Sequence, residues 1–148
     1  MEVVMTKENK LDVLDELSKG CSMGTDSINY VLDKVENKKL KKILEEQCKN
    51  YEKISSKIEK LYSKHSDKEP HETNMMEKMM TWYGIQMRIN DDDNESKIAE
   101  LFIKGTNMGI IEGRKLLNNK DNDKKTHDLI QEYVDFQEEY VEKLKEFL

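Results

Sequence analysis

The chain has 148 residues, with 25 basic and 31 acidic side chains and a formal net charge of −6. This length suits one domain, residues 1–148, and leaves no room for a second. An all-β fold with many tight turns is excluded, because such folds use more proline and glycine than the one proline and six glycines present here. The acidic balance and the presence of only two arginines, Arg88 and Arg114, disfavour a nucleic-acid surface, which usually relies on guanidinium contacts.

Neither a membrane span nor an export signal is evident in the sequence. No apolar run approaches the roughly 18 residues that a membrane-spanning helix needs. The N-terminal segment MEVVMTKENK becomes charged too early for a signal peptide. Cys21 and Cys48 are not spaced as a CxxC pair, so we expect two reduced thiols. These features predict a cytoplasmic protein that does not bind membranes.

Apolar residues recur every three or four positions over two long segments in the first half of the chain, as in amphipathic helices. The first predicted helix spans about 7–36, with Thr6 as its N-cap. The second spans about 38–64, after a short turn at Asn37. Two helices joined so tightly must be antiparallel, so residues 7–65 are predicted to form a hairpin. The expected inward positions are Leu14, Leu17, Cys21, Gly24, Ile28, Val31 and Val35, then Leu40, Leu44, Gln47, Tyr51, Ile54, Ile58 and Leu61.

The second half of the chain predicts another hairpin, over 95–148. Its helices span about 95–117 and 124–148 and are separated by a polar turn. The expected inward positions are Ile98, Phe102, Gly105, Gly109, Glu112 and Leu116, then Ile130, Tyr133, Gln137, Tyr140, Leu144 and Phe147.

A connecting helix is predicted between the hairpins, over 70–90, and it is rich in methionine. Because it has almost no polar face, it should be covered on more than one side. We therefore predict a homodimer through Met76, Met80, Tyr83 and Met87. Thioethers also suit Cu(I), but methionine is far more often a packing residue.

A short motif, K-G-x-x-M-G, occurs once in each hairpin. Lys19–Gly24 matches Lys104–Gly109 at an offset of 85 residues. The match continues beyond the motif. Tyr51 aligns with Phe136 and, after one inserted residue, Glu52 aligns with Glu138. The sequence therefore predicts an internal duplication.

The paired glycines of this motif lie inside predicted helices, where each costs about 1 kcal/mol relative to alanine. A favourable packing interaction at these glycines is therefore expected to offset this cost. Our hypothesis is that the first and fourth helices approach closely at these glycines, with two methionines at the flanks. The alternative is that the glycines mark kinks. The residues of this predicted packing motif are Gly20, Met23, Gly24, Gly105, Met108 and Gly109.

The repeated motif, the stretch Trp82-x-x-Ile85-x-Met87 and the segment Ile98–Glu112 resemble small, uncharacterised ferritin-like proteins of low-GC, spore-forming bacteria. The resemblance implies an all-α, ferritin-like four-helix bundle made of two hairpins and a connecting helix. Active members of the superfamily hold a carboxylate-bridged di-iron site. One glutamate comes from each of two helices, and a Glu-x-x-His pair comes from each of the others.

The sequence departs from that ligand pattern. It has no Glu-x-x-His, and His65, His71 and His127 lie near predicted helix ends. The inward polar candidates are instead Gln47, Glu112 and Gln137, with Glu52 and Glu138 beside them. They indicate either a non-standard oxygen-ligand metal site or a buried hydrogen-bond network.

We predict the second of these: no catalytic residue, cofactor or metal, and a structural or protein-interaction role. The alternative is a metal-binding or iron-oxidising protein with an unusual carboxylate site. A third possibility is an apolar ligand held under the methionine-rich helix.

Overall fold

The computed structural model describes residues 7–63, 95–119 and 121–148. Within these ranges the chain is all-helical, as predicted. Four long helices, α1 (Lys7–Val31), α2 (Lys38–Ser63), α4 (Glu95–Leu117) and α5 (Lys124–Lys145), are accompanied by a short 3-10 helix, η1 (Leu32–Lys34). None of the helices in this part of the chain is long and apolar enough to cross a membrane.

Several predictions concern residues outside these ranges. They include the Thr6 cap, His65, His71, and the methionine-rich helix with its dimer surface. They stay predictions.

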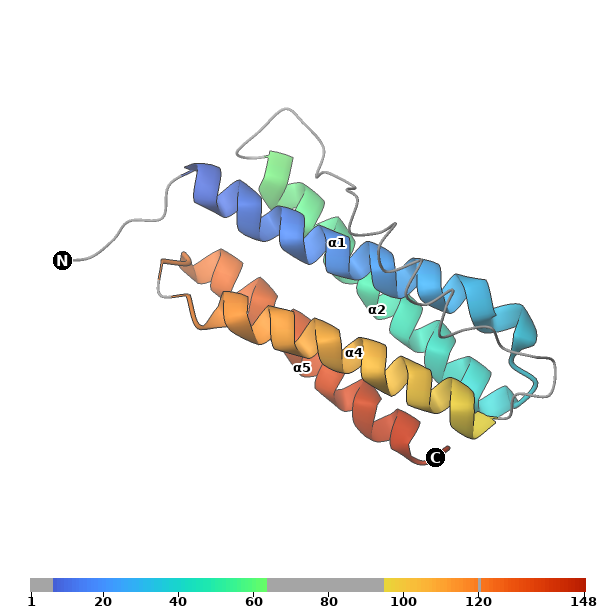
Figure 1. Ribbon diagram of the computed structural model, residues 1–148. Helices are drawn as coiled ribbons and strands as arrows, with labels where there is room; N and C mark the ends of the chain where they lie inside the picture. Colours follow the sequence, from blue (N-terminus) through green and yellow to red (C-terminus); the bar gives the residue numbers. More distant parts are fainter. Residues whose placement is uncertain (1–6, 64–94, 120) are drawn as a thin grey trace.

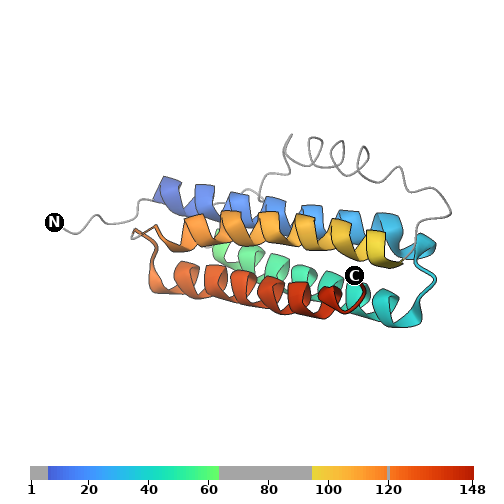
Figure 2. The same cartoon turned by 60° about the horizontal axis from the view of Figure 1, so that its bottom comes forward.

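The four helices lie side by side and alternate in direction (Figure 1). Turning the molecule shows α1 next to α4 in one layer and α2 next to α5 in the other (Figure 2). The closest packing is within each hairpin, α1 against α2 and α4 against α5. Helices α2 and α5 also pack together, whereas α1 and α4 contact each other far less. The two hairpins are therefore joined mainly through α2 and α5.

Side-chain caps explain where two of the helices begin. Asn37 Oδ1 accepts hydrogen bonds from the backbone N–H groups of Lys39 and Leu40, at 2.9 and 3.0 Å, at the start of α2. Asp123 Oδ1 accepts from the N–H of Thr126 at 2.8 Å at the start of α5. Each cap satisfies donors that have no partner within the helix.

Two helices end earlier than the periodicity predicts. Helix α1 stops at Val31 rather than near residue 36, because the chain tightens into η1 and Val35 adopts extended backbone angles. Helix α5 stops at Lys145, three residues before the chain ends. By contrast, α4 has the predicted bounds, and α2 follows its prediction through Ser63, the last residue described before the gap. Apolar periodicity continues past a helix end when the next residues still cover the core, as buried Val35 does.

One apolar core runs through all four helices. It contains most of the predicted inward residues, and the α2 and α5 positions follow the predicted spacing closely. The largest fully buried apolar side chains are Leu14, Leu17, Ile28, Val31, Leu40, Leu44, Ile54, Ile58, Ile130 and Leu144. Burial of this surface is the main force that holds the hairpins together.

Candidate functional site

A cluster of polar side chains lies in the middle of this apolar core. Gln47 and Tyr51 come from α2, and Tyr133 and Gln137 come from α5. All four are buried, with exposed fractions of 1 to 4%. In each pair the residues are four positions apart, so they lie on the same face of their helix. The prediction that Gln47 and Gln137 point inward is confirmed.

Hydrogen bonds from this cluster cross between the two hairpins. The Tyr51 hydroxyl donates to Gln137 Oε1 at 3.0 Å, and Gln137 Nε2 donates to the backbone carbonyl of Tyr133 at 3.1 Å. Gln47 Nε2 donates to Thr106 Oγ1 of α4, also at 3.0 Å. Buried polar groups are costly unless they find such partners. The cluster therefore fixes the position of one hairpin against the other.

One atom of the cluster lacks a partner. Gln47 Oε1 is fully buried and accepts no hydrogen bond from the described residues. A buried acceptor without a donor costs about 1–3 kcal/mol. Native structures retain few such groups, and a bound water or ligand is a common reason for one.

The helical glycines make room for this cluster. A Cβ at Gly20 would overlap the Tyr133 hydroxyl, one at Gly24 would overlap the Tyr51 ring, and one at Gly109 would overlap Gln137 Oε1. The hypothesis that α1 and α4 approach backbone to backbone at these glycines is therefore wrong. The missing side chains instead give space to tyrosine and glutamine from α2 and α5.

A cavity of about 210 Å³ lies over the cluster, between α1 and α4. All four helices contribute to its lining, and each of the five glycines in the described part of the chain is part of it. The apolar side chains of the lining are Leu17, Met23, Ile28, Phe102, Met108 and Leu116, and the floor is formed by Gln47, Tyr51, Tyr133 and Gln137. The site is thus a mostly apolar hollow with neutral polar groups at its base.

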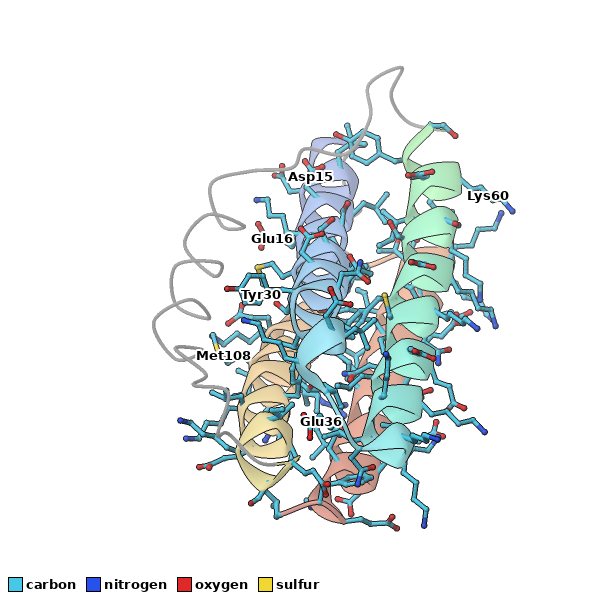
Figure 3. All side chains as sticks on the ribbon, turned by 90° about the vertical axis from the view of Figure 1, so that its right-hand side faces the viewer. Asp15, Glu16, Tyr30, Glu36, Lys60 and Met108 are labelled. Atoms are coloured by element: carbon cyan, nitrogen blue, oxygen red, sulfur yellow. The ribbon has the colours of Figure 1, made fainter. Side chains whose placement is uncertain are left out.

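The edge of the cavity carries charged and flexible residues. Glu16 pairs with Lys19 at 3.0 Å, and Glu112 pairs with Lys115 at 3.3 Å. Figure 3 shows Glu16 and Met108 on the same side of the molecule, opposite Lys60. Met108 is 39% exposed, so it borders the cavity rather than filling the core as expected.

Glu112, predicted to point inward, does not. Its side chain is 65% exposed, and the next residue, Gly113, takes the buried position. A Cβ at Gly113 would lie 2.7 Å from Val134 Cγ2. Burying a carboxylate in this place would require a compensating partner, whereas the small Gly113 lets α5 pack closely.

The other candidate metal ligands are also at the surface. Glu52 and Glu138 are both exposed, and Glu138 accepts a hydrogen bond from Arg114 at 3.4 Å. His127 is half exposed near the start of α5, 3.8 Å from Asp128. Among the described residues, no three histidine, cysteine, aspartate or glutamate side chains come together to hold a metal.

The Tyr133 phenol and the thiols of Cys21 and Cys48 stay protonated at neutral pH. Burial raises the pKa of the Tyr133 hydroxyl and of the Cys21 thiol above their usual ranges. Burial, together with the nearby Glu52 carboxylate, raises the pKa of Cys48 to about 11. Neither thiol is activated as a nucleophile, since a reactive cysteine needs a lowered pKa.

Three members of the site were not singled out from the sequence. Thr106, Tyr51 and Tyr133 appear there as ordinary members of helical segments, although Thr106 binds Gln47 and the tyrosines form the floor. A usable signal was the pairing of a glutamine with a tyrosine four residues away in both α2 and α5. Such pairs place polar atoms side by side on an otherwise apolar face.

Comparison of the chain with protein-family models, with curated proteins and with solved structures found no match in any of the three. The function is therefore inferred from the chemistry of the central site.

The glycine contacts predict which of two alanine substitutions lowers the free energy of unfolding more. Gly24→Ala should lower the free energy of unfolding by about 2 kcal/mol, because the new methyl group meets the Tyr51 ring, which is held against Phe136. Gly109→Ala should cost less, since the new methyl group meets the amide end of Gln137 and lies 3.3 Å from the Tyr133 hydroxyl, rather than overlapping an aromatic ring. Urea unfolding measures both. A Gly24→Ala protein as stable as the wild type would contradict this packing.

Proposed function

We propose that this chain is a non-catalytic, ferritin-like helical bundle with a structural or protein-interaction role. One observation carries the proposal. The middle of the helices is occupied by buried, neutral amide and phenol side chains, Gln47, Tyr51, Tyr133 and Gln137. Tyr51 donates to Gln137, and Gln47 donates to Thr106, across the core. Active members of the ferritin-like superfamily keep carboxylates and imidazoles at that depth.

The chemistry of these neutral groups does not suit iron oxidation. A carboxylate-bridged pair of iron ions needs anionic oxygen ligands and imidazoles. Amide oxygens carry no charge, and the raised pKa of Tyr133 keeps its phenol protonated. The glutamates that could replace them, Glu52, Glu112 and Glu138, are exposed.

Matched contacts in the two hairpins support the ferritin-like duplication. Gly24 faces Tyr51, and Gly109 faces Gln137. The two glycines are 85 residues apart, and the two residues that they face are 86 residues apart. This correspondence matches Tyr51 with Gln137, instead of the Phe136 expected from the sequence. The hydrogen bond between Tyr51 and Gln137 then joins two equivalent positions, as expected near a twofold axis.

Charged residues at the interface of α2 and α5 follow the same correspondence. Lys57 Nζ lies 2.7 Å from Glu132 Oε1. The residues equivalent at an offset of 86 are Lys143 and Glu46. The pKa of Lys143 is raised mainly by its hydrogen bond with Glu139, and the Glu46 carboxylate adds to the effect. Lys143 thus pairs with Glu139 of its own helix, and Glu46 of α2 contributes only a weaker attraction at the equivalent place.

The proposed setting is the cytoplasm, where two free thiols would stay reduced. The proposed partner is a second copy of the chain, bound through the methionine-rich segment that contains Met76, Met80, Tyr83 and Met87. That surface is inferred from the sequence pattern alone.

Iron measurements test the lack of catalysis. Protein purified without chelators should contain far less than one iron per chain, and added Fe(II) should oxidise in air at the rate seen in buffer. Stoichiometric iron, or faster oxidation, would contradict the proposal. A variant with Glu52→Gln and Glu138→Gln is the control, because it should lose any iron that is held by those surface carboxylates.

Light scattering tests the dimer. At high concentration the full chain should show twice the mass of the 17.5 kDa monomer. Met80→Glu combined with Tyr83→Glu should give the monomer mass, because two buried charges would oppose an apolar interface. Lys60→Glu, an exposed change on α2, is the matched control and should leave the dimer intact. A wild-type protein that stays monomeric would contradict the proposed interface.

A further inference from the structure

The middle of α1 is more buried than its described neighbours explain. Every residue from 17 to 28 is buried or half-buried. In α2, by contrast, an exposed residue recurs every three or four positions between 42 and 60. Helix α1 packs closely against α2 and contacts α4 and α5 far less. A helix with neighbours on part of its circumference exposes the rest, so another part of the protein covers α1.

Two side chains show which side of α1 is covered. Residues nine positions apart in a helix point in opposite directions, because nine residues make about two and a half turns. Lys19 therefore points away from Ile28, and Met23 points away from Leu14. Ile28 and Leu14 are fully buried in the core. Yet the Lys19 side chain is only 15% exposed, and Met23 is half-buried. The covered side is thus the one that faces away from the core.

Exposed apolar side chains gather on the same layer of the bundle. Among the described residues, the large apolar side chains that are exposed are Tyr30 of α1, Met108 and Ile111 of α4, and the terminal Leu148. Figure 3 shows Tyr30 and Met108 on the same side of the molecule, opposite Lys60. Neighbouring exposed apolar residues are typical of a contact surface.

The connection between the two hairpins has to run along the bundle. Helix α2 ends and helix α4 begins at opposite ends of it (Figure 1). The 23 residues of α4 make a helix about 35 Å long. The helix predicted over 70–90 would be about 30 Å long, and the residues on either side of it supply the remaining length. The connection therefore passes over one face of the bundle.

The sequence of this predicted helix has apolar residues for two contacts. Met75, Met79 and Trp82 form one stripe at helical spacing. The stripe through Met80 and Tyr83, which is proposed above to bind a second copy, lies next to it. A helix that packs against one neighbour needs only one stripe. The first stripe is therefore free to contact the bundle, whether or not the chain dimerises.

We propose that the methionine-rich segment packs through Met75, Met79 and Trp82 onto the surface of α1 and α4 around Met23 and Met108 of the same chain. This contact accounts for the burial on the outer side of α1. Packing within one chain is favoured because the segment is already joined to both hairpins, so it loses less entropy than a separate molecule would. The contact does not rest on the proposed structural role or on the dimer.

Trp82 is the one tryptophan of the chain, so its fluorescence tests the contact in the full-length protein. The emission should be shifted to the blue, and the acrylamide quenching constant should be several-fold lower, relative to the urea-unfolded protein. Both values should stay the same when the protein is diluted below any concentration at which light scattering shows a dimer. A protected Trp82 in a monomeric protein would support the contact and contradict only the dimer.

Isotope-filtered NMR on a mixture of labelled and unlabelled chains identifies the surface that Trp82 meets. A nuclear Overhauser effect should join the Trp82 ring to the methyl group of Met23 within one chain. The same effect seen only between chains would overturn the proposal, because a second copy would then occupy the surface. Quenching of Trp82 as in the unfolded protein, or protection that is lost on dilution, would overturn it too.

The variant Met23→Glu places a charge under the proposed contact, where it would lose its hydration. Its Trp82 emission should shift to the red, and the quenching constant should rise several-fold. Lys49→Glu, a change at an exposed position of α2, is the matched control and should behave as the wild type. A Met23→Glu protein that keeps its helices by circular dichroism and still protects Trp82 would contradict the proposal. The wild-type measurements need no variant, so a folding defect would not prevent the test.

Discussion

The hydrogen bond from the Tyr51 hydroxyl to Gln137 Oε1 joins the two hairpins at the centre of the core. Both residues are almost fully buried, and breaking the bond would leave a polar group without water or partner, a cost of about 1–3 kcal/mol. The rest of the centre is arranged around it. Gly24 and Gly109 lack side chains where these two residues need space, and the cavity above them lies between α1 and α4, which contact each other little.

This arrangement has a functional consequence. Amide and phenol groups hold the helices in register and offer hydrogen bonds, but they give neither the negative charge that iron needs nor a group that exchanges protons near neutral pH. The proposed structural or protein-interaction role rests on this neutral chemistry.

Much of the fold could be predicted from the sequence because helical periodicity is a local signal. The bounds of α4 and the inward positions of α2 and α5 agree with it. The site could be predicted only in part. Gln47 and Gln137 were recognisable as polar residues on apolar stripes, but Glu112 was wrongly placed, because a shift of one position along α4 buries Gly113 in its place. The role of the glycines was also misjudged, since it depends on tyrosine and glutamine side chains from other helices.

A double-mutant cycle on Tyr51→Phe and Gln137→Met is the most direct test of this account. The free energies of unfolding of the wild type, the two single variants and the double variant give the coupling between the two side chains. A hydrogen bond at the centre of the core predicts a coupling of about 1 kcal/mol. Additive effects of the two substitutions, with no coupling between them, would contradict the claim that this bond joins the hairpins.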